Sequence, residues 1–291
     1  EILSALNGPP KAPGFDGVTN EVLKLACKSD PKCPNLALKH LTKISNLWYS
    51  TGICPKLCSI GKMQLIPKTG KKDPTKYTSQ RPLTLQPEEA KAPLRILANR
   101  LQNILHERKL LHPAQHAYII GGSVDQCLNL LLNHMEDSMS KNKTLFLLLH
   151  DMHKAFDLTQ WWVLKLTLDR FAIPKKFQTF LLNYLQKSQT FIQTKYGPTD
   201  LISLKNSVKQ GDPLSGYLYI MTLDLMHELC HDQNHFTIPK LGFQWNDTQT
   251  CSMGYADDVS TTSDTLGGTH ELTKFVGEYA KFHTTSLNPK K

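Results

Sequence analysis

Short apolar runs and stretches of helical periodicity follow one another along the chain, without an internal repeat or a low-complexity tract. Residues 144–151, Thr-Leu-Phe-Leu-Leu-Leu-His-Asp, form an apolar run of strand length that ends on a carboxylate. Residues 63–68 and 80–85 predict two more strands, which a polar, Lys-rich loop over residues 69–79 separates. The pattern therefore predicts strands and helices mixed along one chain.

Three helices are indicated by periodicity and by their starting residues. We expect helices over residues 20–27 and 91–107, where Pro93 is tolerable only near the first turn. Ser123 with Gln126 three residues later is typical of a capping box at the start of a third helix. Five apolar residues of that helix share one face, which predicts core packing. They are Leu128, Leu131, Leu132, Met135 and Met139.

A fourth helix is expected after the segment Val-Lys-Gln-Gly-Asp-Pro-Leu-Ser-Gly at residues 208–216. Its Gln-Gly pair permits a close approach of ligand to backbone, and Asp212 with Pro213 predicts an N-cap followed by the first helical residue. The helix is expected to continue through Leu229, with Gln210 at its entry beside the strands that carry aspartates.

The most informative string is Gly-Tyr-Ala-Asp-Asp-Val at residues 254–259. Strand-like residues 250–253 and 259–262 flank it, so we expect a hairpin that exposes Asp257 and Asp258 at its tip. Adjacent carboxylates raise each other's pKa, so such a turn is costly unless a cation neutralises them. Magnesium binds through one or two carboxylates while substrate phosphates complete its shell. The alternative is a solvated turn, in which Asp is also a favoured residue.

A third carboxylate joins this pair at the end of the apolar strand. Because a buried strand is almost wholly apolar, Asp151 is expected to point out of the sheet at the strand end. Asp157 competes for the same role, but capping a helix that begins near Thr159 explains it more simply. Phe156 is interpreted either as a core residue or as part of the site.

The 291 residues suffice for a substantial core, in one large domain or two smaller ones. The net charge of +9 is unevenly distributed, because residues 39–109 contain 14 Lys or Arg and only four Asp or Glu, a net charge of +10. A basic region attached to a neutral one that contains the aspartates indicates a surface for phosphates beside a metal site. A solubilising surface is the alternative, and the salt sensitivity of nucleic-acid binding separates the two.

The seven cysteines are interpreted as reduced thiols of an intracellular protein, because Cys27 with Cys33 and Cys54 with Cys58 lack zinc-finger spacing. No apolar run reaches the length of a membrane-spanning helix. The chain begins Glu-Ile-Leu, with neither an initiator Met nor a signal peptide, so we expect a soluble fragment of a longer protein.

In their order and spacing, these segments resemble the reverse transcriptase domain of non-LTR, LINE-type retrotransposons. Lys-Ala-Pro-Gly-Phe-Asp-Gly at residues 11–17 and Leu-Ala-Asn-Arg-Leu at residues 97–101 favour this type over retroviral enzymes. The other matches follow the order of the family's motifs. They are Leu-Ile-Pro-Lys (65–68), Arg-Pro-Leu-Thr-Leu (81–85), residues 115–125, residues 151–157, Gln-Gly-Asp-Pro-Leu-Ser (210–215), Tyr-Ala-Asp-Asp (255–258) and residues 287–291.

The resemblance implies an α+β fold with the architecture of a right-hand polymerase. Residues 1–143, rich in fingers elements, would precede a palm with an antiparallel sheet over residues 144–291, together forming a single reverse transcriptase domain. The chain is expected to stop before the thumb. No endonuclease, zinc-knuckle or RNase H motif is visible in the sequence.

The resemblance also implies the chemistry of the site. Asp151, Asp257 and Asp258 would hold two Mg²⁺ ions, with Mn²⁺ as a substitute, and would transfer a nucleotide from a dNTP to the 3′-hydroxyl of a primer. Lys68 and Arg81 would grip the incoming triphosphate, for which the planar guanidinium of Arg is well suited.

Four further residues acquire roles from the resemblance. Phe156 would be the steric gate that excludes a 2′-hydroxyl, Gln210 would lie against the sugar and base of the nucleotide, and Arg95 and Arg100 would contact nucleic acid. The implied partners are an RNA template, a DNA primer and dNTPs, without a membrane. The implied location is intracellular, and nuclear for an element of a eukaryote.

Three positions depart from the family pattern. Gly122 stands where Arg is usual, Gly216 where Pro follows Leu-Ser, and Ser286 where Gly precedes Leu-Asn. None of them is an expected metal ligand. The main alternative is a catalytically inactive, reverse-transcriptase-like domain that binds RNA or an RNA/DNA hybrid. An RNA-dependent RNA polymerase is another, but it would require a residue smaller than Phe156 at the gate.

Overall fold

The computed structural model describes residues 1–28, 35–68, 70, 73, 76, 79–232, 234–236 and 241–287. The chain divides into two compact units, and each is built from two separate stretches. Unit 1 comprises Glu1–Arg100 and Leu168–Ser215, and unit 2 comprises Leu101–Thr167 and Gly216–Lys291. The boundary expected between residues 143 and 144 does not coincide with this division, because the chain passes between the two units three times.

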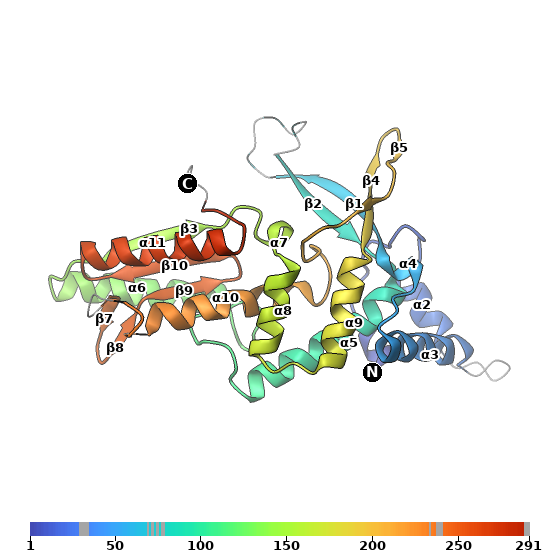
Figure 1. Ribbon diagram of the computed structural model, residues 1–291, viewed down its shortest axis with the longest axis horizontal. Helices are drawn as coiled ribbons and strands as arrows, with labels where there is room; N and C mark the ends of the chain where they lie inside the picture. Colours follow the sequence, from blue (N-terminus) through green and yellow to red (C-terminus); the bar gives the residue numbers. More distant parts are fainter. Residues whose placement is uncertain are drawn as a thin grey trace. The chain divides into compact units, whose positions relative to one another are not determined.

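Unit 1 contains a mixed sheet (Figure 1). Strand β1 (Ile60–Pro67) pairs antiparallel with β2 (Gln80–Leu85) and parallel with β4 (Gln189–Thr194). Two short strands, β5 (Gly197–Pro198) and β6 (Ile202–Ser203), pair antiparallel with β4. Both strands predicted for this region are confirmed, and β2 has the expected bounds. The predicted loop over residues 69–79 lies largely outside the described residues.

The helices of unit 1 supply most of its core. Trp48 packs against Phe180 and Tyr184, with ring centroids 4.9 and 5.6 Å apart. A second apolar cluster joins Ile2 and Leu41 among other buried residues. The helices are α1 (Ile2–Ala5), α2 (Asn20–Ala26), α3 (Leu36–Thr51), α4 (Lys56–Ser59) and α9 (Lys175–Gln186), with parts of α5 (Glu88–Glu107) and α8 (Trp161–Arg170).

Helix α5 begins three residues earlier than the sequence analysis expected, at Glu88. The buried Glu88 carboxylate binds Lys91 and Arg95 at 2.8 Å each, and an acidic residue in the first turn also suits the helix dipole. Pro93 therefore lies in the second turn rather than at the helix start.

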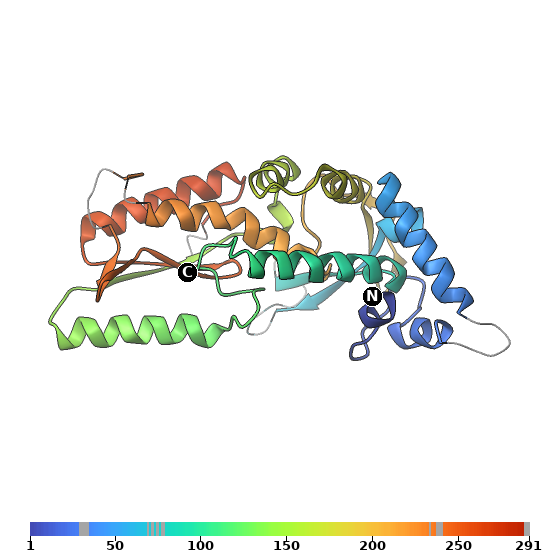
Figure 2. The same ribbon diagram turned by 90° about the horizontal axis from the view of Figure 1, so that it is seen from below.

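Unit 2 is built on the antiparallel sheet β3-β10-β9. Its strands are β3 (Phe146–Asp151), β9 (Ser252–Tyr255) and β10 (Asp258–Ser263). Figure 2 shows this sheet between α6 (Val124–Ser140) on one side and α10 (Ser215–His231) with α11 (Leu266–Phe282) on the other. The remaining elements of the unit are α7 (Ala155–Leu158), β7 (Phe243–Trp245) and β8 (Thr248–Thr250).

The expected orientation of α6 is wrong. The helix buries His134 and Asp137, whereas four of the five apolar residues expected in the core are exposed and the fifth is half-buried. Polar groups take the inner face because the His134 ring packs 4.9 Å from that of Phe243 and Lys143 pairs with Asp137 at 3.3 Å. The exposed residues are Leu128, Leu132, Met135 and Met139.

Two expected helix starts also differ in detail. Ser123 is the N-cap of α6 but its hydroxyl makes no capping bond, and the Gln126 amide donates to the Gly121 carbonyl at 3.0 Å. Helix α10 begins at Ser215, and Asp212 caps the preceding turn by accepting from the Leu214 N–H at 2.9 Å. Asp157 lies inside α7, four residues before α8 begins at Trp161.

The cysteines and the helix lengths are known for the described residues. The described cysteines, Cys27, Cys54, Cys58, Cys127, Cys230 and Cys251, are free thiols, whereas Cys33 lies outside the described residues. None of the described helices combines the length and the apolar character that crossing a membrane requires.

Candidate active site

The Asp-Asp pair lies at the tip of the hairpin that β9 and β10 form. Asp258 is the first residue of β10 and pairs with Tyr255 across a two-residue loop, Ala256 and Asp257. On the other side, Asp258 pairs with Asp151, the last residue of β3. Directly opposed residues of antiparallel strands project on the same face, with Cβ atoms about 5 Å apart. The sheet register therefore places Asp151 opposite Asp258.

The three aspartates differ in exposure and together make their surroundings negative. Asp258 is exposed, whereas Asp151 and Asp257 are half-buried. Burial raises the pKa of Tyr219, and the charges of Asp257 and Asp258 raise it further. Burial and the charge of Asp257 likewise raise the pKa of Tyr118. The field of the carboxylates thus extends to both tyrosines.

The donor set suits a hard divalent cation. No group of three or more His, Cys, Asp or Glu side chains among the described residues is arranged to hold a metal ion. Magnesium does not require such a cage, because it binds through one or two carboxylates and completes its shell with water and phosphate oxygens. The opposed carboxylates of Asp151 and Asp258, with Asp257 beside them, fit that requirement.

A hollow of about 410 Å³ lies beside the aspartates within unit 2. It is lined by Asp151 and Leu149 of β3, Asp258 of β10 and Tyr255 of β9, with apolar residues of α6. Leu149 is 74% exposed although it belongs to the apolar strand, so this face of the sheet is open to solvent. The site therefore combines carboxylates with an accessible surface of the size that ligands occupy.

Phe156 follows β3 and lies on α7. Its ring is half-buried and stacks on Tyr219, with centroids 4.7 Å apart and planes at 24°. Burial and the charges of Asp257 and Asp258 raise the pKa of Tyr219, the partner of Phe156 in this stack. The Phe156 ring is only half-buried and is not enclosed in the core.

Backbone pairing next to Asp151 involves the last described residues. The His153 N–H donates to the Ser286 carbonyl at 2.8 Å, and Met152 forms a bridge with Leu287. Ser286 thus takes part through its backbone, which any residue provides. Residues 288–291 of the expected terminal motif lie outside the described residues.

In unit 1, Lys68 and Arg81 lie at the same end of the β1–β2 hairpin. Arg81 pairs with Ile66, and the Lys68 N–H donates to the Ser79 carbonyl at 2.8 Å, which continues the ladder by one pair. Residues two apart share a face, so Lys68 and Arg81 are diagonal neighbours on one face of the hairpin. Both are exposed, as phosphate-binding side chains must be.

The Gln210-Gly211 segment docks against β2 of the same unit. The Gln210 carbonyl accepts from the Thr84 N–H at 3.1 Å. Gly211 has a φ of +102°, and a Cβ there would lie 2.9 Å from the Thr84 carbonyl oxygen. The expected close approach at this glycine is therefore made by the protein's own strand. Gln210 is half-buried and belongs with Lys68 and Arg81 to unit 1.

A buried polar network that sequence reasoning missed holds this segment. The Tyr184 hydroxyl donates to Asp212 at 2.6 Å and accepts from the Gln86 amide. The Lys209 ammonium, 2% exposed, donates to the Ser59 carbonyl at 3.4 Å, and burial lowers its pKa to about 8. Burial raises the pKa of Asp212, which Tyr184, Leu214 and Lys209 partly oppose. The only sign of this network in the sequence is the pair of charged residues, Lys209 and Asp212, on either side of Gln210-Gly211.

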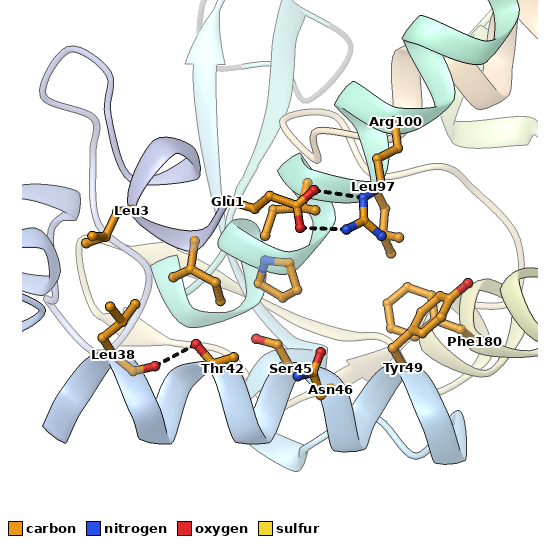
Figure 3. A pocket seen from close by; sticks show the side chains of 13 residues that line it. Glu1, Leu3, Leu38, Thr42, Ser45, Asn46, Tyr49, Leu97, Arg100 and Phe180 are labelled. Carbon is orange, nitrogen blue, oxygen red and sulfur yellow. Dashed lines mark hydrogen bonds and ion pairs between the residues drawn. The ribbon is translucent and has the colours of Figure 1, made fainter. Parts of the chain in front are cut away.

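The two arginines expected to contact nucleic acid have partners within unit 1. The Arg95 guanidinium binds Glu88 at 2.8 Å and the Ala5 carbonyl at 3.0 Å, and its side chain is 18% exposed, which supports a structural role. Arg100 is exposed and pairs with Glu1 at 3.0 Å (Figure 3). That pair borders a mainly apolar hollow of about 400 Å³ between α1, α3, α5 and α9.

Known proteins similar to this chain come from mobile elements. The chain is 29% identical over its full length to the Pol polyprotein of the type-1 retrotransposable element R2 of Popillia japonica, of which it covers 38%. It is 25% identical over its full length to the probable RNA-directed DNA polymerase of transposon BS of Drosophila melanogaster, of which it covers 31%. The chain thus spans about a third of the length of these relatives.

Solved structures of telomerase share the fold. The apo telomerase of Candida tropicalis truncated from its C-terminal domain superposes with a TM-score of 0.57 at 17% identity, over 89% of this chain and 55% of that one. The Candida albicans telomerase, solved with a fragment of telomeric RNA, gives a TM-score of 0.56 at 14% identity, over 94% and 49%. The expected α+β fold of fingers and palm is therefore confirmed.

The family itself follows from residues 66–291, which match the reverse transcriptase (RNA-dependent DNA polymerase) family. This stretch includes all three aspartates, Phe156 and Gln210. The resemblance drawn from the motifs is confirmed, and the chain belongs to the reverse transcriptase family.

Proposed function

We propose that this chain is the polymerase part of an RNA-directed DNA polymerase of a non-LTR retrotransposon. The observation that carries the proposal is the register of β3 and β10, which sets Asp151 opposite Asp258 with Asp257 in the adjoining turn. The reaction is the addition of a nucleotide from a dNTP to the 3′-hydroxyl of a primer paired with an RNA template.

Asp151, Asp257 and Asp258 are the proposed metal ligands. Two bound Mg²⁺ ions, or Mn²⁺ in their place, would activate the primer hydroxyl and stabilise the leaving pyrophosphate. The protein's part is to position these groups and to neutralise charge, since phosphoryl transfer demands little covalent chemistry from it. Close carboxylates repel one another, and a bound cation would relieve that repulsion, which supports a metal site.

The other proposed roles concern the nucleotide. Phe156, which lies on α7 and stacks on Tyr219, would exclude a 2′-hydroxyl. Lys68 and Arg81, exposed on one face of the β1–β2 hairpin, would bind the triphosphate. Gln210, which the backbone of β2 holds, would contact the sugar and base. The basic residues concentrated between positions 39 and 109 would bind the phosphates of template and primer.

Primer extension tests the proposal on the full-length protein. With poly(rA)/oligo(dT), dTTP and Mg²⁺, Asp257→Ala and Asp151→Ala are each expected to abolish extension, because each removes a ligand to the metal. Asp247→Ala serves as the matched control, since Asp247 is an exposed aspartate of unit 2 outside the site.

Two results would contradict the proposal. Extension at a tenth or more of the unmodified rate would remove the altered aspartate from the metal site. If the unmodified protein binds the hybrid but never extends the primer, the chain is a binding domain that keeps the fold of a polymerase. A steady signal with the Asp247→Ala control excludes a general effect of losing a carboxylate.

A further inference from the structure

A buried glutamine binds the turn that carries the Asp-Asp pair. Gln115 is fully buried in the loop before α6, and its Oε1 accepts from the backbone N–H groups of Ala256 and Ala117, both at 3.0 Å. Its Nε2 donates to the Ala256 carbonyl at a longer 3.5 Å. One carboxamide thus contacts both backbone polar groups of Ala256, the residue before Asp257.

Ala256 has a conformation that requires such support. Its φ is +58°, in the left-handed region, where a residue with a Cβ is strained by roughly 1 kcal/mol or more. A two-residue hairpin loop needs a positive φ there, and glycine is the usual choice. The hydrogen bonds from Gln115 satisfy the backbone of Ala256 in this conformation and oppose its relaxation.

The backbone around Gln115 fastens the same hairpin. The Gly254 N–H donates to the Ala114 carbonyl at 2.8 Å, and the His116 N–H donates to the Gly254 carbonyl at 2.9 Å. A Cβ on Gly254 would lie 3.2 Å from Gln115 Nε2 and 2.7 Å from His227 Nε2. The loop therefore pairs with the free edge of β9, and glycine at 254 allows the Gln115 amide to reach the turn.

We propose that Gln115 is a positioning residue of the active site. Its carboxamide fixes the turn at Ala256 and thereby the directions of the Asp257 and Asp258 carboxylates. The inference rests on the proposed polymerase function for its effect on turnover, but the effect on the turn and on metal binding does not depend on turnover. The alternative is that Gln115 is only a buried structural residue, whose replacement would lower the stability of the protein without a specific effect on the turn or on metal binding.

The experiment compares Gln115→Met, Gln115→Glu and a control in the full-length protein. Methionine keeps length and volume but neither donates nor accepts, whereas a buried glutamic acid is protonated and restores both functions. Gln178→Met is the matched control, because Gln178 is 4% exposed and its amide bonds Asp169 and the Ile173 carbonyl, each at 2.9 Å.

Three measurements separate positioning from stability: amide hydrogen exchange of peptides covering residues 252–260, Mn²⁺ binding at the sites that Asp257→Ala removes, and steady-state extension. Gln115→Met is expected to weaken hairpin protection and Mn²⁺ affinity by about tenfold each. It should lower kcat by about tenfold or more, with the KM for dTTP within about threefold, because small misplacements cost turnover. Gln115→Glu should restore the protection, and Gln178→Met should change only the melting temperature.

Unchanged hairpin protection and Mn²⁺ affinity in Gln115→Met, together with a lower melting temperature like that of Gln178→Met, would overturn the inference. A full-length protein that never extends a primer would refute the proposed function alone, because exchange and Mn²⁺ binding still decide the role of Gln115. Should Gln115→Met fail to fold, Gln115→Glu decides, since failure to recover hairpin protection and Mn²⁺ affinity contradicts the proposed hydrogen bonds.

Discussion

Two glycines of unit 2 stand where the family carries larger residues, and each has a steric reason. A Cβ on Gly122 would lie 2.1 Å from the His116 carbonyl oxygen. A Cβ on Gly216 would lie 2.3 Å from the Tyr118 ring, which packs over the start of α10. These departures from the family pattern therefore belong to this chain's own packing, and neither disturbs an aspartate.

Gly122→Ala is expected to destabilise the protein by about 1–3 kcal/mol, because the added methyl group meets backbone that has to shift. Urea unfolding measures the change. Gly277→Ala is the control of opposite sign, since Gly277 lies inside α11 and its nearest atom to a new Cβ is 3.9 Å away. A helical Gly-to-Ala change there should stabilise by roughly 0.5–1 kcal/mol. Equal stability of Gly122→Ala and the unmodified protein would contradict the steric account.

Phe156 gives a prediction about sugar selectivity. Phe156→Val should raise the incorporation of ribonucleotides relative to deoxyribonucleotides by about tenfold, because a smaller side chain leaves room for the 2′-hydroxyl. The ratio of kcat/KM for UTP and dTTP on an RNA template measures the effect. If stability falls through loss of the Tyr219 stack but the ratio is unchanged, Phe156 is a packing residue.

Elements with a strong local signal could be predicted from the sequence. Strand β2 has the expected bounds, and the apolar run before Asp151 forms β3, because both are set by short-range alternation or apolar content. The hairpin at Asp257 and Asp258 was equally local. The pairing of strands distant in sequence could not be predicted. Strand β4, the parallel partner of β1, lies more than 120 residues farther along the chain, and neither strand's sequence indicates that the two pair.

The face of α6 could not be predicted because periodicity identifies an apolar stripe without saying what covers it. Asp137 pairs with Lys143, which lowers the cost of its burial, and the His134 ring packs against that of Phe243 although neither ring nitrogen has a hydrogen-bond partner. The role of Gln115 could not be predicted, because a glutamine in a loop carries no sign that its amide will reach residue 256. The sequence analysis expects Asp151 to join the Asp-Asp pair at a strand end but predicts no register, and the pairing of Asp151 with Asp258 is found only in the structure.

The network at the entry of α10 predicts a dependence of stability on pH. Lys209 has a pKa of about 8 when folded and about 10.4 in an unfolded chain, so the unfolded state binds more protons between these values. Its contribution makes stability rise with pH from about 8 to about 10.4, by at most about 1.4 kcal/mol per pH unit. Below pH 8 both states carry the charge and this dependence vanishes.

Urea midpoints at pH 7.5, 9 and 10 measure the effect against Lys209→Met. The difference between the two proteins isolates Lys209, because the other titrating groups, including the Cys54 thiol and the Tyr184 hydroxyl, are common to both. As pH rises, the stability of the unmodified protein to urea should increase relative to that of Lys209→Met. Parallel curves would show that the Lys209 ammonium is not desolvated as described.

At the scale of the whole molecule, charge is the property that bears on partners. The net charge of +9 resides almost entirely between positions 39 and 109, whereas the aspartates belong to unit 2. A polyanion is therefore attracted by one part of the chain and a cation by another. This distribution is consistent with the proposed function, in which nucleic acid and a metal-bound nucleotide are the substrates.

Binding of an RNA/DNA hybrid is accordingly expected to weaken steeply with salt. For about five phosphate contacts, the slope of log K against log salt is about −4.5, measurable by fluorescence anisotropy. Replacing the exposed Lys39 and Lys43 of α3 with Ala should reduce the slope by up to about 2, whereas replacing Lys274 and Lys281 of α11 should leave it unchanged. A slope of log K against log salt near zero would show that the basic residues between positions 39 and 109 form a solubilising surface and do not bind phosphates.

The order in which the sheet of unit 2 can be completed is a consequence of its register. Strand β3 pairs only with β10 among the described strands, and β10 begins at Asp258, more than a hundred positions after Asp151. On a ribosome, the apolar segment from Phe146 to Leu149 emerges long before its partner exists, a condition that favours aggregation. A nascent chain interrupted before residue 258 would expose an unpaired apolar strand, so the residues that complete the site also protect the newly made protein.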